Sequence, residues 1–84
     1  MVTYMKKIKI EDLTEIFTSV FPDSTIQNSI LNLQLGDIEE WDSQGHLNLL
    51  LSIEDFYNIR FTMDQMAEIK SIKQIIEVLE GHSN

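Results

Sequence analysis

The sequence predicts an all-α fold of four helices, with a long loop between the first two and a short third helix. Apolar residues recur at helical spacing near both ends of the chain, and no segment alternates polar and apolar residues as a strand would. Residues typical of helix starts precede the last three segments. At 84 residues the chain has room for one domain. We expect that domain to span residues 1–84, with a helical core over about 10–80 and a loose leader over 1–9.

The first helix is predicted from a single apolar face. Its residues fall at i, i+3, i+4 and i+7: Leu13, Ile16, Phe17 and Val20. Pro22 should end this helix, because its ring disfavours a helical conformation in the preceding residue. The polar segment 23–33 predicts a long connection with one short helical turn, and Gly36 with Asp37 marks a turn near its end.

The second helix should begin after Asp42, a preferred N-cap, run to about Tyr57 and end at Asn58 as a C-cap. Its predicted core stripe is Leu49, Leu50, Ile53, Phe56 and Tyr57. The opposite face holds Gln44, Asn48, Ser52 and Asp55. Leu47 and Leu51 lie one turn apart at the edge of the stripe, so we expect them to be only partly buried.

Two capping boxes predict the last two helices. Thr62 with Gln65 opens a short helix through Ile69, in which Met63 and Met66 should be pliable core residues. A second box opens a helix that Gly81 ends. That box is formed by Ser71 and Gln74, and the apolar face that follows it by Ile72, Ile75, Ile76 and Leu79.

The chain is strongly acidic. Fourteen acidic residues oppose six basic ones, and the formal net charge is −8. Such a surface repels nucleic acid and anionic membranes and attracts proteins with basic patches, so we expect protein partners, no nucleic acid and no membrane. The chain has no cysteine, so any thiol must come from an added group. It also has no apolar run as long as a membrane span and no secretory signal pattern, which predicts a cytoplasmic protein, and we expect a monomer.

The segment 40–47 places Ser43 in the first turn of an amphipathic helix, directly after the acidic N-cap Asp42. Free backbone N–H groups and the helix dipole favour an anion at such a position. Gly45 has no β-carbon, so a bulky group or a partner surface could approach closely. An Asp-Ser pair before an apolar helix is also a common capping arrangement without chemistry. The segment alone therefore leaves both interpretations open.

A longer pattern favours the chemical interpretation. Trp41-Asp42-Ser43, the run from Gly45 to Phe56, and Ile59-Arg60-Phe61 together closely resemble the phosphopantetheine attachment segment of acyl carrier proteins. The flanking helices resemble that family as well, so the resemblance covers about residues 10–79. It implies a four-helix bundle of acyl-carrier type and a discrete, non-catalytic carrier that serves as cosubstrate of other enzymes.

The resemblance implies specific roles. Ser43 would carry 4′-phosphopantetheine, derived from coenzyme A, and Asp42 would cap the helix and help the modifying transferase to engage magnesium and coenzyme A. The implied partner-facing residues are Gln44, Leu47, Leu51, Glu54 and Asp55. The implied partners are a phosphopantetheinyl transferase, an acyl- or aminoacyl-loading ligase and downstream acyl-processing enzymes of fatty-acid, polyketide or other specialised biosynthesis. Gln44 replaces a usual leucine and Asn48 an often acidic residue, so the resemblance leaves the choice of partners open. Trp41 and the run Gly45-His46-Leu47 resemble stand-alone carriers of specialised pathways, or aminoacyl carriers, more than the central fatty-acid carrier.

Other interpretations compete with this one. A Ser43–His46 hydrolytic pair lacks an orienting acid and an oxyanion hole, and we expect His46 to face solvent. A calcium loop with Gly45 at its sixth position fails, because its twelfth residue is Leu51 instead of a glutamate. Trp41 is expected to pack against the loop. The alternative function is an acidic helical interaction domain that is never modified.

Overall fold

The computed structural model describes residues 8–24 and 29–81, and these residues form helices and no strands. The elements are α1 (Ile10–Val20), the 3₁₀-helix η1 (Ile30–Asn32), α2 (Ser43–Tyr57), α3 (Met63–Glu68) and α4 (Ile72–Gly81). This confirms the predicted all-α class, the long first connection and the short third helix. Most of the predicted leader lies outside the described residues; of its members, Ile8 is half-buried and Lys9 is the N-cap residue of α1.

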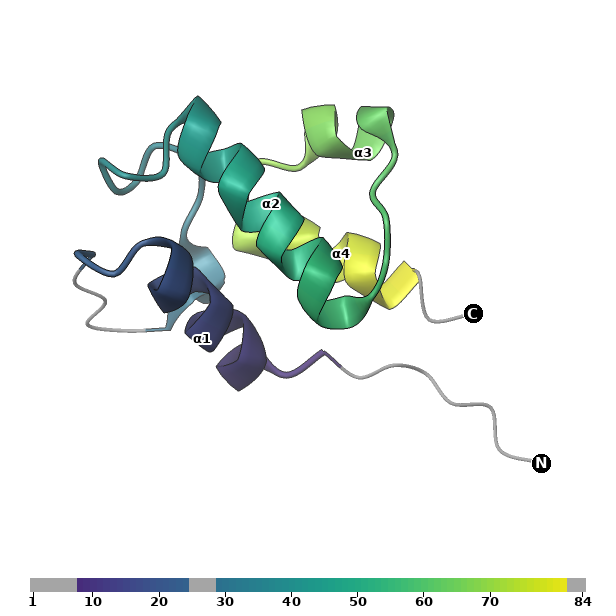
Figure 1. Ribbon diagram of the computed structural model, residues 1–84, viewed down its shortest axis with the longest axis horizontal. Coiled ribbons are helices and arrows are strands. Elements are labelled where there is room, and N and C mark those ends of the chain that lie inside the picture. The colour runs from purple at the N-terminus through teal and green to yellow at the C-terminus, as the bar shows by residue number, and fades with distance from the viewer. Residues whose placement is uncertain (1–7, 25–28, 82–84) are drawn as a thin grey trace.

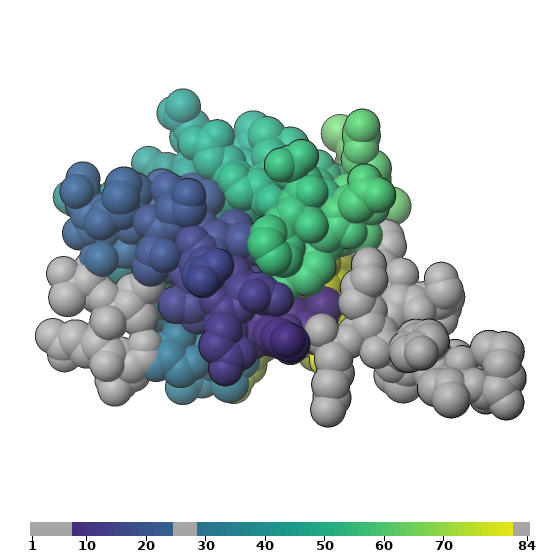
Figure 2. All heavy atoms as spheres, turned by 60° about the horizontal axis from the view of Figure 1, so that its bottom comes forward, coloured from purple at the N-terminus to yellow at the C-terminus, as the bar shows by residue number. Residues whose placement is uncertain are grey.

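The helices surround one apolar core (Figure 1). α2 crosses the middle of the molecule, α1 packs along it in the opposite direction, and α4 lies behind it. η1 contacts both α1 and α4, and its residue Ile30 is buried in the core. The space-filling view shows the surface of α1 directly beside that of α2 (Figure 2).

The predicted apolar faces supply most of the core. Leu13, Ile16 and Phe17 of α1 are buried against Leu49, Leu50 and Ile53 of α2 and Ile72, Ile75 and Leu79 of α4. Burial of a large aliphatic or aromatic side chain contributes about 1.5–3 kcal/mol, which makes this shared core the main stabilising feature of so short a chain. Phe61 and Ile69, in the links on either side of α3, are also buried.

The predicted caps are largely confirmed. Asn58 has left-handed dihedral angles (φ 57°, ψ 49°) at the end of α2, and Thr62 with Gln65 forms a complete capping box on α3. The start of α4 differs in one contact. The Ser71 hydroxyl accepts from the backbone N–H of Gln74 at 3.1 Å, but the Gln74 side chain accepts from the backbone N–H of Lys70 at 2.8 Å. The Ser71 contact of the second box is therefore as predicted, and only the return contact of Gln74 is shifted by one residue, from Ser71 to Lys70.

Backbone hydrogen bonds tie the long connection to the link before α4. The N–H of Leu35 donates to the carbonyl of Lys70 at 2.7 Å, and the N–H of Ile72 donates to the carbonyl of Leu33 at 3.1 Å. Gly36 then turns with a φ of +94°, a conformation that L residues rarely adopt, and donates to the carbonyl of Trp41 at 3.0 Å. These contacts fix the path by which the chain enters α2.

Two predicted core residues lie at the surface. Phe56 is 53% exposed and Met63 is 86% exposed. Phe56 lines an open groove between α1 and α2, so part of its ring meets solvent, and Met63 is the first residue of a helix too short to bury two methionines. Met66 does pack against the core. No helix in the described part of the chain is both long and apolar enough to cross a membrane.

Candidate functional site

Ser43 is the first residue of α2, and its side chain is exposed. No other described residue forms a hydrogen bond with its hydroxyl. Asp42 is the N-cap, as predicted, and its Oδ1 accepts from the backbone N–H of Gly45 at 2.9 Å. The amides of Ser43 and Gln44 precede His46, whose N–H is the first to donate within the helix (to the carbonyl of Asp42 at 2.7 Å), so they remain available to an anion at this helix end. The hydroxyl and these two donors therefore lie on the same exposed turn.

His46 does not face solvent, and that prediction is wrong. The side chain is only 9% exposed, and both ring nitrogens are hydrogen bonded. Nδ1 lies 2.9 Å from Nε1 of Trp41, and Nε2 lies 2.6 Å from the carbonyl oxygen of Ile69. An indole N–H can only donate, so Nδ1 must accept and the proton must be on Nε2. His46 is thus a neutral residue that joins the start of α2 to the end of α3.

Trp41 is fully buried behind the site. Its ring meets that of Phe17 at a centroid distance of 5.4 Å in an edge-on arrangement, and it stacks on His46 at 6.0 Å. The prediction that Trp41 packs against the loop understated its role, because Trp41 contacts α1 and α2 together. The residue directly before Asp42 is therefore held by the core, which fixes the direction in which the helix start points.

Gly45 meets an internal constraint. A β-carbon at this position would overlap the carbonyl oxygen of Glu40 and lie 2.9 Å from a ring carbon of Phe21. The absence of a side chain lets the loop and Phe21, the residue after α1, approach the first turn of α2. The sequence predicts a space beside Gly45 that is open to an added group or a partner surface. In the structure this space is occupied by the Glu40 carbonyl and the Phe21 ring of the same chain.

The implied partner-facing residues fall into two groups. Gln44 and Asp55 are exposed, and Leu47 and Leu51 are 47% and 48% exposed, which agrees with their expected position at the edge of the stripe. Glu54 differs: it is half-buried, and its Oε2 accepts from the backbone N–H of Phe61 at 2.7 Å. Glu54 thus anchors the link between α2 and α3, and its carboxylate is already engaged within the chain.

The geometry limits the alternative chemistries. His46 cannot serve as a base for Ser43 in this arrangement, because both of its ring nitrogens are bonded elsewhere and the ring is buried. Residues 8–24 and 29–81 contain no cluster of three or more His, Cys, Asp or Glu side chains able to hold a metal ion. What the site offers is an exposed hydroxyl on a firmly positioned helix start.

Sequence reasoning named His46 and Gly45 but did not find their supporting roles. A signal for His46 existed in its spacing, because it precedes Leu49, Leu50 and Ile53 by three, four and seven positions and so shares their side of the helix. No local signal could reveal its partner at Ile69, which is 23 residues away.

Comparison with known proteins gave no match to a family model, to a curated protein or to a solved structure.

Proposed function

We propose that the protein is an acyl carrier protein that bears 4′-phosphopantetheine on Ser43. The observation that carries the proposal is the exposed Ser43 hydroxyl at the capped start of α2, within a segment that resembles the attachment segment of carrier proteins. The described residues fit the group: the hydroxyl has no competing partner among them, and free amides at the helix end favour a phosphodiester.

The attachment reaction is a phosphoryl-group transfer. The Ser43 oxygen would bond to the phosphorus next to the pantetheine of coenzyme A while the bond from that phosphorus to adenosine bisphosphate breaks, and the serine proton would pass to a base of the modifying transferase. The chain contributes the nucleophile and its orientation, through the Asp42 cap and the buried Trp41. The exposed carboxylate of Asp42 is also suited to engage the magnesium ion of the modifying transferase.

The added arm supplies the thiol that the cysteine-free sequence lacks. Acyl or aminoacyl cargo is carried on this thiol as a thioester and is presented to partner enzymes, in a role that is not catalytic. Gln44, exposed beside the attachment site, offers an amide where carriers of general fatty-acid synthesis usually offer an apolar side chain. Burying an unpaired amide in an apolar pocket costs about 1–3 kcal/mol, so this carrier suits partners of a specialised pathway.

Docking of partner enzymes is proposed on the exposed side of α2. Leu47 and Leu51 form an apolar pair beyond Ser43, and Asp55 provides an exposed negative charge further along the same helix. The formal net charge of −8 favours partners with basic patches. Glu54 contributes less to docking than its charge suggests, because it is bound to the backbone of Phe61.

A second candidate function is an unmodified interaction domain. The exposed Leu47, Leu51 and Met63 favour it, because apolar side chains at the surface mark protein contacts whether or not a cofactor is attached. The two functions differ in one measurable property. Incubation with coenzyme A, magnesium and a broad-specificity phosphopantetheinyl transferase increases the intact mass by one phosphopantetheine group for a carrier, and leaves it unchanged for an interaction domain.

A further inference from the structure

A groove of about 310 Å³ lies between α1 and α2, at a distance from Ser43. Its lining comes from Glu15, Ile16 and Ser19 of α1 and from Ser52, Asp55 and Phe56 of α2. Ser52 follows Ser43 by nine residues, which corresponds to about 13 Å along a helix. The groove is therefore distinct from the attachment site, and it adjoins the docking surface proposed for the carrier, because Leu51 directly precedes Ser52 and Asp55 belongs to both.

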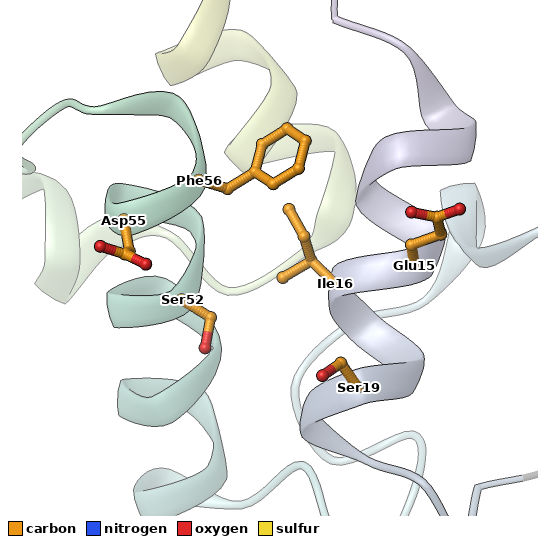
Figure 3. Close-up of a pocket in the computed structure, with 6 residues that line it drawn as sticks. All are labelled: Glu15, Ile16, Ser19, Ser52, Asp55 and Phe56. Carbon is orange, nitrogen blue, oxygen red and sulfur yellow. The ribbon is translucent and has the colours of Figure 1, made fainter.

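The groove combines an apolar centre with acidic flanks. Figure 3 shows Ile16 and the ring of Phe56 between the two helices, with Glu15 on α1 and Asp55 on α2 to either side. Ile16 is buried, so it forms the floor, whereas Phe56 is 53% exposed. Glu15 and Asp55 are exposed as well, so both carboxylates are accessible from the solvent.

Phe56 is the residue that indicates a partner. It lies three positions after the buried Ile53, where helical periodicity predicts core, yet half of its surface meets water. Its ring packs edge-on against Tyr57 at a centroid distance of 4.8 Å, which holds it beside the groove. A positioned aromatic ring in a concave site with charged flanks is typical of the anchor positions of protein interfaces.

We propose that the α1–α2 groove is a second docking site, which takes a basic segment of a partner protein. An aliphatic or aromatic side chain of that segment inserts between Ile16 and Phe56, and a flanking arginine or lysine pairs with Glu15. Charge complementarity selects this occupant: with a formal net charge of −8, a second copy of the chain is repelled and a cationic segment is attracted. This goes beyond the carrier proposal, because nothing in it requires Ser43.

The test is a titration of the ¹⁵N-labelled full chain followed by NMR. The probe is a capped ten-residue peptide that alternates leucine and arginine; matched peptides alternate serine with arginine and leucine with glutamate. We expect the first peptide alone to shift the amides of Glu15, Ser19, Ser52 and Phe56 in a saturable manner. Phe56→Ala should weaken its affinity by at least about fivefold, because buried aromatic anchors dominate interface energies.

Glu15→Lys provides an independent variant at an exposed position and should weaken binding by roughly three- to tenfold. Its matched control is Glu77→Lys, the same charge change at an exposed position of α4, which should change affinity less than twofold. Ser43→Ala should bind like wild type. That control separates the two proposals, because a failure of Ser43 modification leaves groove binding unaffected and the reverse also holds.

Several results would overturn the groove proposal. Equal binding of the serine–arginine peptide would show a purely electrostatic surface, and shifts centred on Leu47 and Leu51 would place the site elsewhere. Unchanged affinity in both Phe56→Ala and Glu15→Lys, with native-like spectra, would remove the groove residues from binding. Markedly tighter binding by a chain that lacks residues 1–7 would show that the chain's own basic N-terminal segment, and not a partner, is the occupant.

Discussion

The indole N–H of Trp41 donates a 2.9 Å hydrogen bond to Nδ1 of His46, across the turn that carries Ser43. The same imidazole binds the carbonyl of Ile69 through its other nitrogen, so one neutral ring connects the loop, α2 and the end of α3. The exposed serine thus lies on a helix start that is held in place by the buried, hydrogen-bonded side chains of Trp41 and His46. A helix start that is fixed in this manner presents its hydroxyl in one direction, which an enzyme that modifies it requires.

Removal of the imidazole should be costly. In His46→Ala, the indole N–H of Trp41 and the carbonyl of Ile69 lose their partner in a buried environment, and each unsatisfied group costs about 1–3 kcal/mol. We expect the free energy of unfolding in urea to fall by about 2–4 kcal/mol. Asn48→Ala, on the exposed side of the same helix, is the control and should change it by about 0.5 kcal/mol or less. Equal effects of the two substitutions would show that the hydrogen bonds add no stability.

Gly45 should not tolerate a β-carbon. Alanine is the better helix former by about 1 kcal/mol, but its β-carbon would overlap the Glu40 carbonyl oxygen and press on Phe21. We expect Gly45→Ala to be destabilising by about 1–3 kcal/mol in thermal or chemical unfolding, as overpacking usually is. At Gly81, the last residue of α4, an added β-carbon meets nothing within 4 Å, so Gly81→Ala should be neutral or stabilising. A stabilised Gly45→Ala protein would contradict the packing described for the helix start.

Leu47 and Leu51 should matter more for partners than for folding. Each is about half exposed, so Leu→Ala at either position should lower the free energy of unfolding by about 1 kcal/mol or less. Leu50→Ala is the matched control: Leu50 is buried on the same helix, and its truncation should cost about 2–5 kcal/mol. Turnover by a cognate partner enzyme, corrected for folded protein, should fall for Leu47→Ala and Leu51→Ala. Unchanged turnover in both variants would exclude this pair from docking.

Tyr57 should make stability depend on alkaline pH. Burial raises the pKa of its phenol above 10.0, and the negative charge of Asp12 raises it further. The unfolded chain therefore loses this proton first, so ionisation of Tyr57 leaves the free energy of unfolding unchanged below pH 10.0 and lowers it as the pH rises from there toward the folded-state pKa. Tyr57→Phe should remove this decline. At neutral pH it should be neutral or stabilising, because the buried hydroxyl has no hydrogen-bond partner among the described residues. Parallel pH profiles of the two proteins would contradict this assignment.

The helices could be predicted because their signals are local. The face of α1, the Asp42 and Asn58 caps and the Thr62–Gln65 box depend on residues within a few positions of one another, and the structure has each of them where the pattern placed it. The exposed position of Ser43 follows from the same local signals. The helical part of the fold and the location of the candidate site were therefore accessible from the sequence.

What escaped prediction depends on contacts between distant segments. His46 is buried because Ile69, 23 residues later, returns to it, and Gly45 is constrained by a loop carbonyl and by Phe21 of the segment after α1. Phe56 lies on a face of α2 that periodicity assigns to the core. Ile53 is the last fully buried residue on that face, and Phe56, one turn later, is half exposed. A periodic pattern specifies which face turns inward and not how far the neighbouring helices extend to cover it.

The most direct test of the central claim is the intact mass of the purified chain after incubation with coenzyme A, magnesium and a broad-specificity phosphopantetheinyl transferase. Wild type and Ser52→Ala should each gain one phosphopantetheine group, and Ser43→Ala should gain none. Asp42→Asn retains a good N-cap, so it should keep its stability but be modified more slowly, because it lacks the exposed carboxylate. A wild-type chain that is never modified, or a Ser43→Ala chain that still gains the group, would contradict the carrier assignment.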